Sequence, residues 1–292
     1  MGNDEIIWKD EYCIGVSLVD NAHKMLFELV SKLNRVINDT QMNREGYACY
    51  EAINFLKEYT VRHFEEEEAY MLKIKYPGYY NHKAVHDNLR FVVLPEFEDR
   101  LKKTRFSKDV VDEFAALITG WLYGHILIED MAITGRIASR YNYVDEDAKV
   151  LLRRELERFG RDFIRIRLHL TDSKYEGRTV AGALYYEMVY KEGYIATIVA
   201  DKRIIMRIAE NISGRKSAAP DKLVLTEYFQ IAQSVAKGAI SLVAREIDDF
   251  HLISHRVFEA KELAGLFLNN LPQYSMLWNS ELGEFALCIL KI

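Results

Sequence analysis

Five of the eight histidines lie in the first half of the chain, at spacings that could serve a metal site. They are His23, His63, His82, His86 and His125. Two carboxylates accompany them, because Glu67 follows His63 by four residues and Asp130 follows His125 by five. Imidazole ligands suit iron, zinc and copper. These seven side chains are therefore the candidate metal ligands of the protein.

The spacing of these residues matches helical geometry in two pairs and departs from it in a third. Residues four apart project from one side of a helix, as His63 and Glu67 would. His82 and His86 form a second pair of this kind. Five residues turn an ideal helix by roughly 500°, which leaves the two side chains about 140° apart. His125 and Asp130 can therefore reach one centre only if they lean together or if the helix bulges, as single wide turns do at functional sites.

His251 and His255 repeat the four-residue spacing in the second half of the chain. The sequence around them, FHLISHRVF, predicts a strand, on which the two side chains would lie about 13 Å apart. The four-residue spacing of two histidines is therefore weak evidence of a metal site. The grouping of five histidines on successive helical segments is what indicates a metal site.

The elements that must position these ligands are helices, because helical periodicity dominates up to about residue 140. The predicted helices span residues 20–38, 43–75, 79–102 and 107–140. Ser107 is the expected N-cap of the fourth helix, and Pro95 should kink or divide the third. Each helix contributes at least one candidate ligand. Short connections favour an antiparallel four-helix bundle, which can direct ligands into its core from all sides.

Seven candidate ligands exceed the needs of one metal ion. A structural zinc site uses four ligands, so the set predicts two metals with bridging carboxylates. Oxygen-activating di-iron sites carry four carboxylates and two histidines. Neutral imidazoles stabilise the higher charge state less than carboxylates do. The histidine-rich set therefore favours reversible oxygen binding over deep oxidation chemistry.

The motifs around the ligands resemble those of the bacterial hemerythrins over about residues 5–140. The resemblance is carried by Trp8 with Gly15 and by residues 19–27 (VDNAHKMLF), 63–67 (HFEEE), 82–86 (HKAVH) and 121–130 (WLYGHILIED). It implies a di-iron centre with one iron on His82, His86 and His125, a second on His23 and His63, and bridges from Glu67 and Asp130.

Three further expectations follow from this resemblance. The second iron keeps an open position for dioxygen, beside an oxo or hydroxo bridge. The family uses the five-residue spacing of His125 and Asp130. Trp121 lies one turn before His125 and is a candidate for lining the oxygen pocket, with plain core packing as the alternative.

The pattern of apolar residues changes near residue 141. A charged helix is predicted over residues 148–159, and further helices over 202–212 and 222–247. Alternating apolar residues predict strands over 163–170, 183–190, 194–199, 251–257, 274–278 and 285–290. The expected fold class is thus an antiparallel helical bundle joined to a mixed α/β domain. The expected domains are residues 1–140 and 161–292, with a charged linker helix at 141–160.

The second half resembles the CheX family of chemotaxis phosphatases over about residues 160–292. The resemblance is carried by residues 201–214 (DKRIIMRIAENISG), 225–241 (LTEYFQIAQSVAKGAIS) and 283–292 (GEFALCILKI). That family uses a Glu-x-x-Asn pair, in which the acid engages the partner and the amide positions the attacking water. Gln230 and Gln233 are the matching residues here, and the neutral Gln230 cannot form the charge-assisted contact. Glu227, one turn upstream, is the alternative acid. We expect partner binding or dimerisation rather than catalysis.

Composition excludes several other classes of protein. The chain has 292 residues, 49% of them hydrophobic, and a net charge of −5 that is spread along its length, which does not favour nucleic-acid binding. Its three cysteines, Cys13, Cys49 and Cys288, lack metal or disulfide spacing, so a reduced, cytoplasmic setting is expected. We also expect no secretion signal and no membrane attachment, because no apolar run approaches the ~20 residues that span a bilayer.

The combined expectation is an oxygen-binding di-iron sensor for signal transduction. The charged helix would pass the oxygen or redox state to the CheX-like domain, which would dock a CheY-like response regulator or another chemotaxis protein. A homodimer formed through that domain is expected. The alternatives are an oxygen-regulated response-regulator phosphatase, a di-iron oxidase or peroxidase, and an oxygen or iron carrier whose second domain only dimerises.

Overall fold

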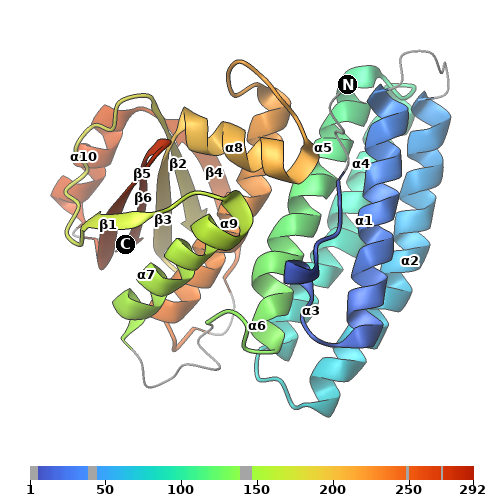
Figure 1. The fold of residues 1–292 in the computed structure, drawn as a ribbon, viewed down its shortest axis with the longest axis horizontal. Helices are drawn as coiled ribbons and strands as arrows, with labels where there is room; N and C mark the ends of the chain where they lie inside the picture. The colour runs from blue at the N-terminus through green and yellow to red at the C-terminus, as the bar shows by residue number, and fades with distance from the viewer. Residues whose placement is uncertain (1–5, 39–44, 139–146, 248–249, 271) are drawn as a thin grey trace. The chain divides into compact units, whose positions relative to one another are not determined.

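The computed structural model describes residues 6–38, 45–138, 147–247, 250–270 and 272–292. The chain divides into two compact units. One comprises Met1–Arg136 with Ile212–Gly214, and the other Ile137–Asn211 with Arg215–Ile292. The expected fold class is confirmed, because the first unit is a helical bundle and the second combines a β-sheet with helices (Figure 1).

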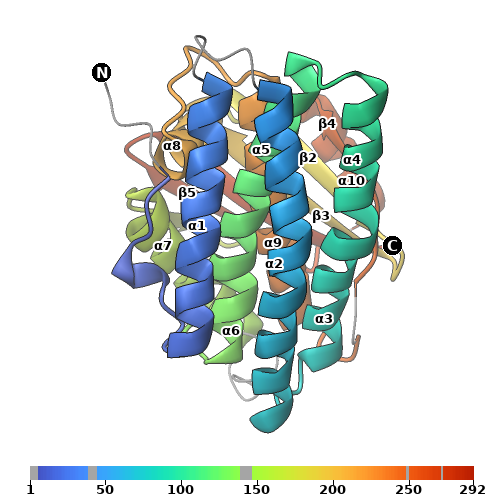
Figure 2. The same ribbon diagram turned by 90° about the vertical axis from the view of Figure 1, so that its right-hand side faces the viewer.

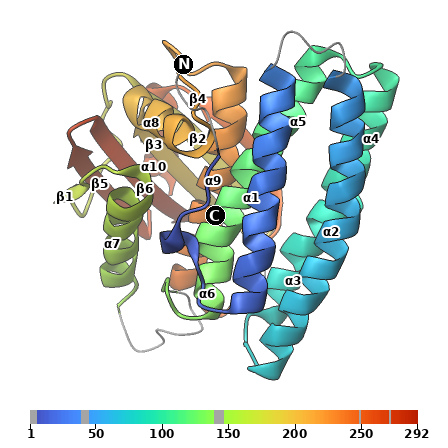
Figure 3. The ribbon, with the colours of Figure 1, turned by 45° about the vertical axis from the view of Figure 1, so that its right-hand side comes forward.

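Long helices that lie side by side form the first unit (Figures 2 and 3). A short 3-10 helix, η1 (Asp10–Tyr12), precedes them. The helices are α1 (Ser17–Asn38), α2 (Glu45–Lys73), α3 (Tyr79–Asn88), α4 (Leu94–Lys103), α5 (Lys108–Gly124) and α6 (Met131–Ile133). α1 packs against α2 and α5, and α2 also packs against α4, so the apolar faces predicted from the sequence meet in one core.

Single π-helical turns interrupt the third and fourth long helices. η2 (Leu89–Val93) joins α3 to α4, and Pro95 lies in the first turn of α4, where a missing N–H group costs little. The third helix is thus divided near Pro95, as predicted. η3 (His125–Asp130) joins α5 to α6. Because π-helical hydrogen bonds run from residue i to i+5, this turn brings His125 and Asp130 toward one side, which is the local bulge that their spacing required.

The fourth long helix supplies much of the bundle core. Ser107 occupies its N-cap position, and the Ser107 carbonyl accepts hydrogen bonds from the backbone of Val110 and Val111. The stretch Lys108–Ile133 is long and apolar enough to cross a membrane, but 78% of its most apolar window is buried inside the protein. This helix is therefore explained as a core helix of the bundle.

An antiparallel six-stranded sheet organises the second unit, in the order β1-β5-β6-β3-β2-β4. The strands are β1 (His169–Asp172), β2 (Ala183–Tyr190), β3 (Tyr194–Asp201), β4 (Leu252–Phe258), β5 (Tyr274–Ser280) and β6 (Gly283–Lys291). β3 lies in the middle of the sheet and is buried along its whole length. Its apolar sequence reflects the covering of both sheet faces.

Helices cover the two faces of this sheet. They are α7 (Ala148–Phe159), the π turn η4 (Gly160–Ile164), α8 (Lys202–Ser213), α9 (Lys222–Val243) and α10 (Ala260–Asn269). Neighbouring strand residues point to opposite faces. Tyr186 packs against Tyr228 of α9, while Tyr185 packs into a cluster with Leu263 of α10.

Three details of the second unit differ from the sequence prediction. The strand predicted over residues 163–170 is wrong at its start, because Gly160–Ile164 forms a π turn and pairing begins only at His169. The alternating residues Ile164, Ile166 and Leu168 are buried, but the segment does not pair as a strand before His169. α10 was not predicted, and the helix that begins at Lys222 ends at Val243 rather than at residue 247.

Candidate metal centre

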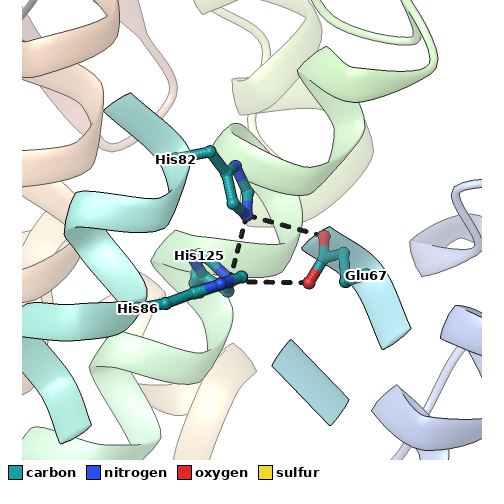
Figure 4. A group of neighbouring side chains, drawn as sticks. All are labelled: Glu67, His82, His86 and His125. Atoms are coloured by element: carbon teal, nitrogen blue, oxygen red, sulfur yellow. Dashed lines mark hydrogen bonds and ion pairs between the residues drawn. The ribbon is translucent and has the colours of Figure 1, made fainter. Parts of the chain in front are cut away.

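Four side chains from the second, third and fourth long helices point toward one another in the core of the bundle (Figure 4). Glu67 comes from α2, His82 and His86 from α3, and His125 from η3. All four are buried, and their potential ligand atoms lie within 4.8 Å of one another. This set, called here the three-histidine group, could hold one metal ion.

Distances between the imidazole nitrogens bear on the coordination geometry. His86 Nε2 lies 3.1 Å from His82 Nε2 and 3.0 Å from His125 Nε2. Nitrogens bound at roughly 2.1 Å to one metal are about 3.0 Å apart at neighbouring octahedral positions and about 3.4 Å apart in a tetrahedron. The spacing in this structure is therefore close to that expected for nitrogens bound to one metal ion.

A second group lies beside the first. His23 from α1 and His63 from α2 have ring centres 4.9 Å apart. Together with Glu67 they form a second buried set whose potential ligand atoms lie within 4.8 Å of one another. Glu67 belongs to both sets. The two groups are therefore contiguous and share a carboxylate.

Asp130 faces both groups with different oxygens. Its Oδ2 lies 3.1 Å from His23 Nε2, in the second group. Its Oδ1 lies 3.1 Å from His125 Nε2 and 3.3 Å from His82 Nε2, in the three-histidine group. One carboxylate is thus directed at two neighbouring positions, which is the arrangement that bridging two metals requires.

Glu67 spans the same two groups. Its Oε1 lies 3.5 Å from His82 Nε2, while its Oε2 lies 3.6 Å from His63 Nε2 and 3.5 Å from His86 Nε2. The structure therefore brings together all seven residues singled out in the sequence, with a carboxylate on either side of the space between the histidines.

The protonation states of these residues favour a bound cation. Burial lowers the pKa of His23 to about 3 and lowers the pKa of His63 and His86 well below the ordinary value, so the imidazoles are neutral donors. Burial and the nearby Asp130 carboxylate raise the pKa of Glu67 well above its ordinary value. In the part of the chain that the structure describes, the carboxylate oxygens of Glu67 and Asp130 are buried and accept no hydrogen bond. Buried charges without partners are costly, and a multivalent cation would offset that cost.

The helical unit is similar in sequence to known proteins. Residues 14–137 match the family model described as the Hemerythrin HHE cation binding domain. The bacteriohemerythrin of Pseudomonas aeruginosa is 32% identical over 125 residues, which cover 43% of this chain and 76% of that protein. The bacteriohemerythrin of Clostridium acetobutylicum is 31% identical over 125 residues, which cover 42% of this chain and 95% of that protein. The chain belongs to the hemerythrin family.

Solved structures also resemble this hemerythrin-family chain. Chemotaxis protein CheX from Vibrio vulnificus has a TM-score of 0.35 and 14% identity, and the match covers 50% of this chain and 96% of that one. A CheC-like superfamily protein from Shewanella sp. PV-4 has a TM-score of 0.35 and 15% identity, covering 50% of this chain and 97% of that one.

Aromatic side chains line the hemerythrin centre. The ring of Trp121 stacks on His125, with centroids 4.5 Å apart and planes 18° apart, so it packs against the three-histidine group. The ring of Trp8 lies 6.1 Å from His23 and 5.3 Å from Phe27, which places it on the other side of the centre. Sequence reasoning treated Trp8 only as part of a motif. The contact of Trp8 with the candidate ligand His23 could not be predicted from the sequence, because Trp8 lies outside the helices and helical periodicity does not place it.

The candidate catalytic residues of the second unit lie on α9. Gln230 and Gln233 are three residues apart and half-buried. Glu227 is fully buried and accepts a hydrogen bond from Arg215 Nε at 3.3 Å. A carboxylate held in this way does not present itself to a docking partner. This geometry argues against Glu227 as a substitute for the missing acid.

The histidines of the second half have other partners. His251 Nδ1 lies 2.8 Å from Glu192 Oε1, and the ring of His255 stacks on Phe229 with centroids 3.7 Å apart. Among the residues that the structure describes, neither histidine belongs to a potential metal-binding group. The four-residue spacing thus belongs to a potential metal-binding group at His82 and His86 but not at His251 and His255.

Proposed function

We propose that the hemerythrin domain binds a pair of iron ions and captures dioxygen reversibly. The observation that carries the proposal is that two buried histidine groups share Glu67 and face Asp130. The proposed ligands are His82, His86 and His125 for one iron, His23 and His63 for the other, and Glu67 and Asp130 as bridges. When bound, a reduced iron pair would supply the electrons that dioxygen takes up on binding and returns on release.

The unequal number of histidines supports a specific side for dioxygen. With the carboxylates shared, the three-histidine group offers five protein donors, whereas the His23 and His63 group offers four. Dioxygen therefore enters on the side of His23 and His63. Trp8 and Phe27 pack near that side and limit the access of water, which protects a reactive site. Trp121 packs against the other group, so its contribution to an oxygen pocket is through the orientation of His125.

For the whole chain we propose an oxygen or redox sensor that acts in the cytoplasm. The second unit would transmit the state of the hemerythrin domain to a CheY-like response regulator or another chemotaxis protein. The engagement of Glu227 by Arg215 and the neutral Gln230 favour docking over phosphatase catalysis. If activity is retained, Gln230 and Gln233 are the residues that would carry it.

A homodimer through the sheet of the second unit is part of this proposal. β4 pairs with β2 on one side and lies at an edge of the sheet. Its residues Ile253 and Val257 are 65% and 49% exposed. Unpaired edge strands with exposed apolar residues are templates for pairing with another chain. Placing a charge at Ile253, as in Ile253→Lys, should therefore convert a dimer to a monomer in size-exclusion chromatography.

Metal analysis and optical spectroscopy test the central proposal. The purified chain should contain two irons and should show a visible band that appears when air reaches the reduced protein. His63→Ala should remove both the band and most of the iron. One zinc and no iron per chain, in protein expressed with adequate iron, would overturn the proposal. Acceleration of response-regulator dephosphorylation that is abolished by Gln233→Ala would replace docking with catalysis in the second unit.

A further inference from the structure

A carboxylate lies behind one of the proposed ligands. His86 directs Nε2 into the three-histidine group, where it lies 3.0 Å from His125 Nε2. The proton of a neutral imidazole with this orientation is on Nδ1. His86 Nδ1 donates to Glu68 Oε1 at 3.1 Å, and the Glu68 side chain is 11% exposed. A hydrogen bond of this kind fixes the tautomer of a ligating histidine and raises its basicity.

Two cations hold the Glu68 carboxylate in place. Arg90 Nη2 lies 3.1 Å from Glu68 Oε1, and Lys83 Nζ lies 3.6 Å from Glu68 Oε2. The same cations also pair with Asp87, at 2.6 Å from Arg90 and 2.9 Å from Lys83. Two anions and two cations thus form a balanced network next to His86. Burial raises the pKa of Glu68, whereas the charges of Lys83 and Arg90 act in the opposite direction and hold the carboxyl group beside His86.

Arg90 also contacts the ring that packs on His86. The Phe64 ring stacks on the His86 ring, with centroids 3.7 Å apart and planes 4° apart. The Arg90 guanidinium lies 5.4 Å from the centre of the Phe64 ring. His86 is therefore fixed in two ways, by a hydrogen bond in the plane of its ring and by stacking on its face. Arg90 supports both contacts.

The second histidine group lacks this support. His23 Nδ1 and His63 Nδ1 are buried, and within the described residues neither makes a hydrogen bond. The two groups therefore differ in the electron donation that their imidazoles provide, as well as in the number of histidines. This asymmetry comes from Glu68, a residue outside both ligand groups.

We propose that Glu68 is a positioning residue that gives His86 partial imidazolate character. This stabilises the higher oxidation state of the metal in the three-histidine group. Arg90 shares the Oε1 atom of Glu68 with His86 and so limits how much charge reaches the imidazole. The inference rests on the proposed function, since it concerns the same iron pair. It implies that the two irons are oxidised at different potentials.

The reduction potential of the iron-loaded, full-length protein tests this role. Glu68→Gln keeps the size of the side chain but removes its charge, so the oxidised state should become less favourable. At a fixed poise the ratio of oxidised to reduced centre should fall about tenfold, which equals ~59 mV for a one-electron couple. Glu68→Asp keeps a carboxylate and should return the potential toward the wild-type value.

Glu65→Gln is the matched control, because Glu65 lies in the same run of four glutamates and is exposed. It removes the same charge without touching a ligand and should leave the potential unchanged. Equal potentials for Glu68→Gln and wild type would overturn the inference, and so would equal shifts in Glu68→Gln and Glu65→Gln. If the wild-type protein itself fails to bind two irons, the proposed function fails instead.

If Glu68→Gln does not retain iron, a second variant tests the role of Glu68. Arg90→Gln leaves the contact between His86 and Glu68 and removes the competing donor, so the potential should shift in the opposite direction, to lower values. Arg62→Gln, at an exposed arginine paired with Glu66, is its control. A potential that is unchanged in Arg90→Gln, or that shifts equally in both arginine variants, would overturn the inference.

Discussion

One carboxylate ties the N-terminal segment to the bundle beside the metal centre. Asp20, in the first turn of α1, accepts hydrogen bonds from Ile14 N at 2.7 Å and from Gly15 N at 3.1 Å. Asp20 is 7% exposed, so water does not replace these contacts. The segment that it holds carries Trp8, which packs near His23. The carboxylate therefore links local backbone structure to the shielding of a proposed ligand.

Removing this carboxylate should destabilise the bundle by a predictable amount. Hydrogen bonds to charged groups contribute ~1.5–3 kcal/mol each, so the loss of two in Asp20→Ala should lower the free energy of unfolding by about 3–6 kcal/mol. Asp20→Asn retains one acceptor oxygen and should lose about half as much. Gly15 has a φ of +92°, so the turn itself depends on glycine and cannot easily rearrange to recover the bonds.

Urea unfolding measured by tryptophan fluorescence tests this expectation. Trp8 and Trp121 lie in the bundle, so a Trp278→Phe background removes the signal of the second unit. The oxygenated form should also decay faster in Asp20→Ala, because Trp8 no longer shields His23. Asp10→Ala, at an exposed residue of η1, is the control. A loss below 1 kcal/mol, or an equal loss in Asp10→Ala, would refute the reasoning.

Two other predictions follow from single contacts. Glu67→Gln should reduce the content of both irons in metal analysis, because Glu67 belongs to both ligand groups, whereas Glu65→Gln should leave it unchanged. Loss of only one iron in Glu67→Gln would contradict a shared carboxylate. In the second unit, Gly283→Ala should lower the free energy of unfolding by ~3 kcal/mol, because its Cβ would lie 2.2 Å from Asp201 Oδ2 at a φ of +114°. Gly265→Ala, on α10 with nothing within 4 Å of the added Cβ, should stabilise the same unit slightly in thermal unfolding, so equal effects of the two substitutions would disprove the steric argument.

The helices of the bundle and most of the ligand pairs could be predicted from the sequence. His63 with Glu67 and His82 with His86 are visible because helical periodicity is a local property. Five of the six strands were also predicted at the correct place in the chain, since their apolar runs are bounded by turns. Extended but unpaired residues such as Ile166 alternate in the same way as a strand, so local pattern could not decide where β1 begins.

The sequence by itself determined which residue types are available to the centre and on which helices they lie. Only the tertiary structure decided how they are used. The π turn aligns His125 with Asp130, although an ideal helix would separate them. In the run of four glutamates, packing turns Glu67 toward the histidine groups and Glu68 toward His86 and leaves Glu65 exposed. These outcomes depend on the rotation and spacing of neighbouring helices, which non-local contacts set and local periodicity does not encode.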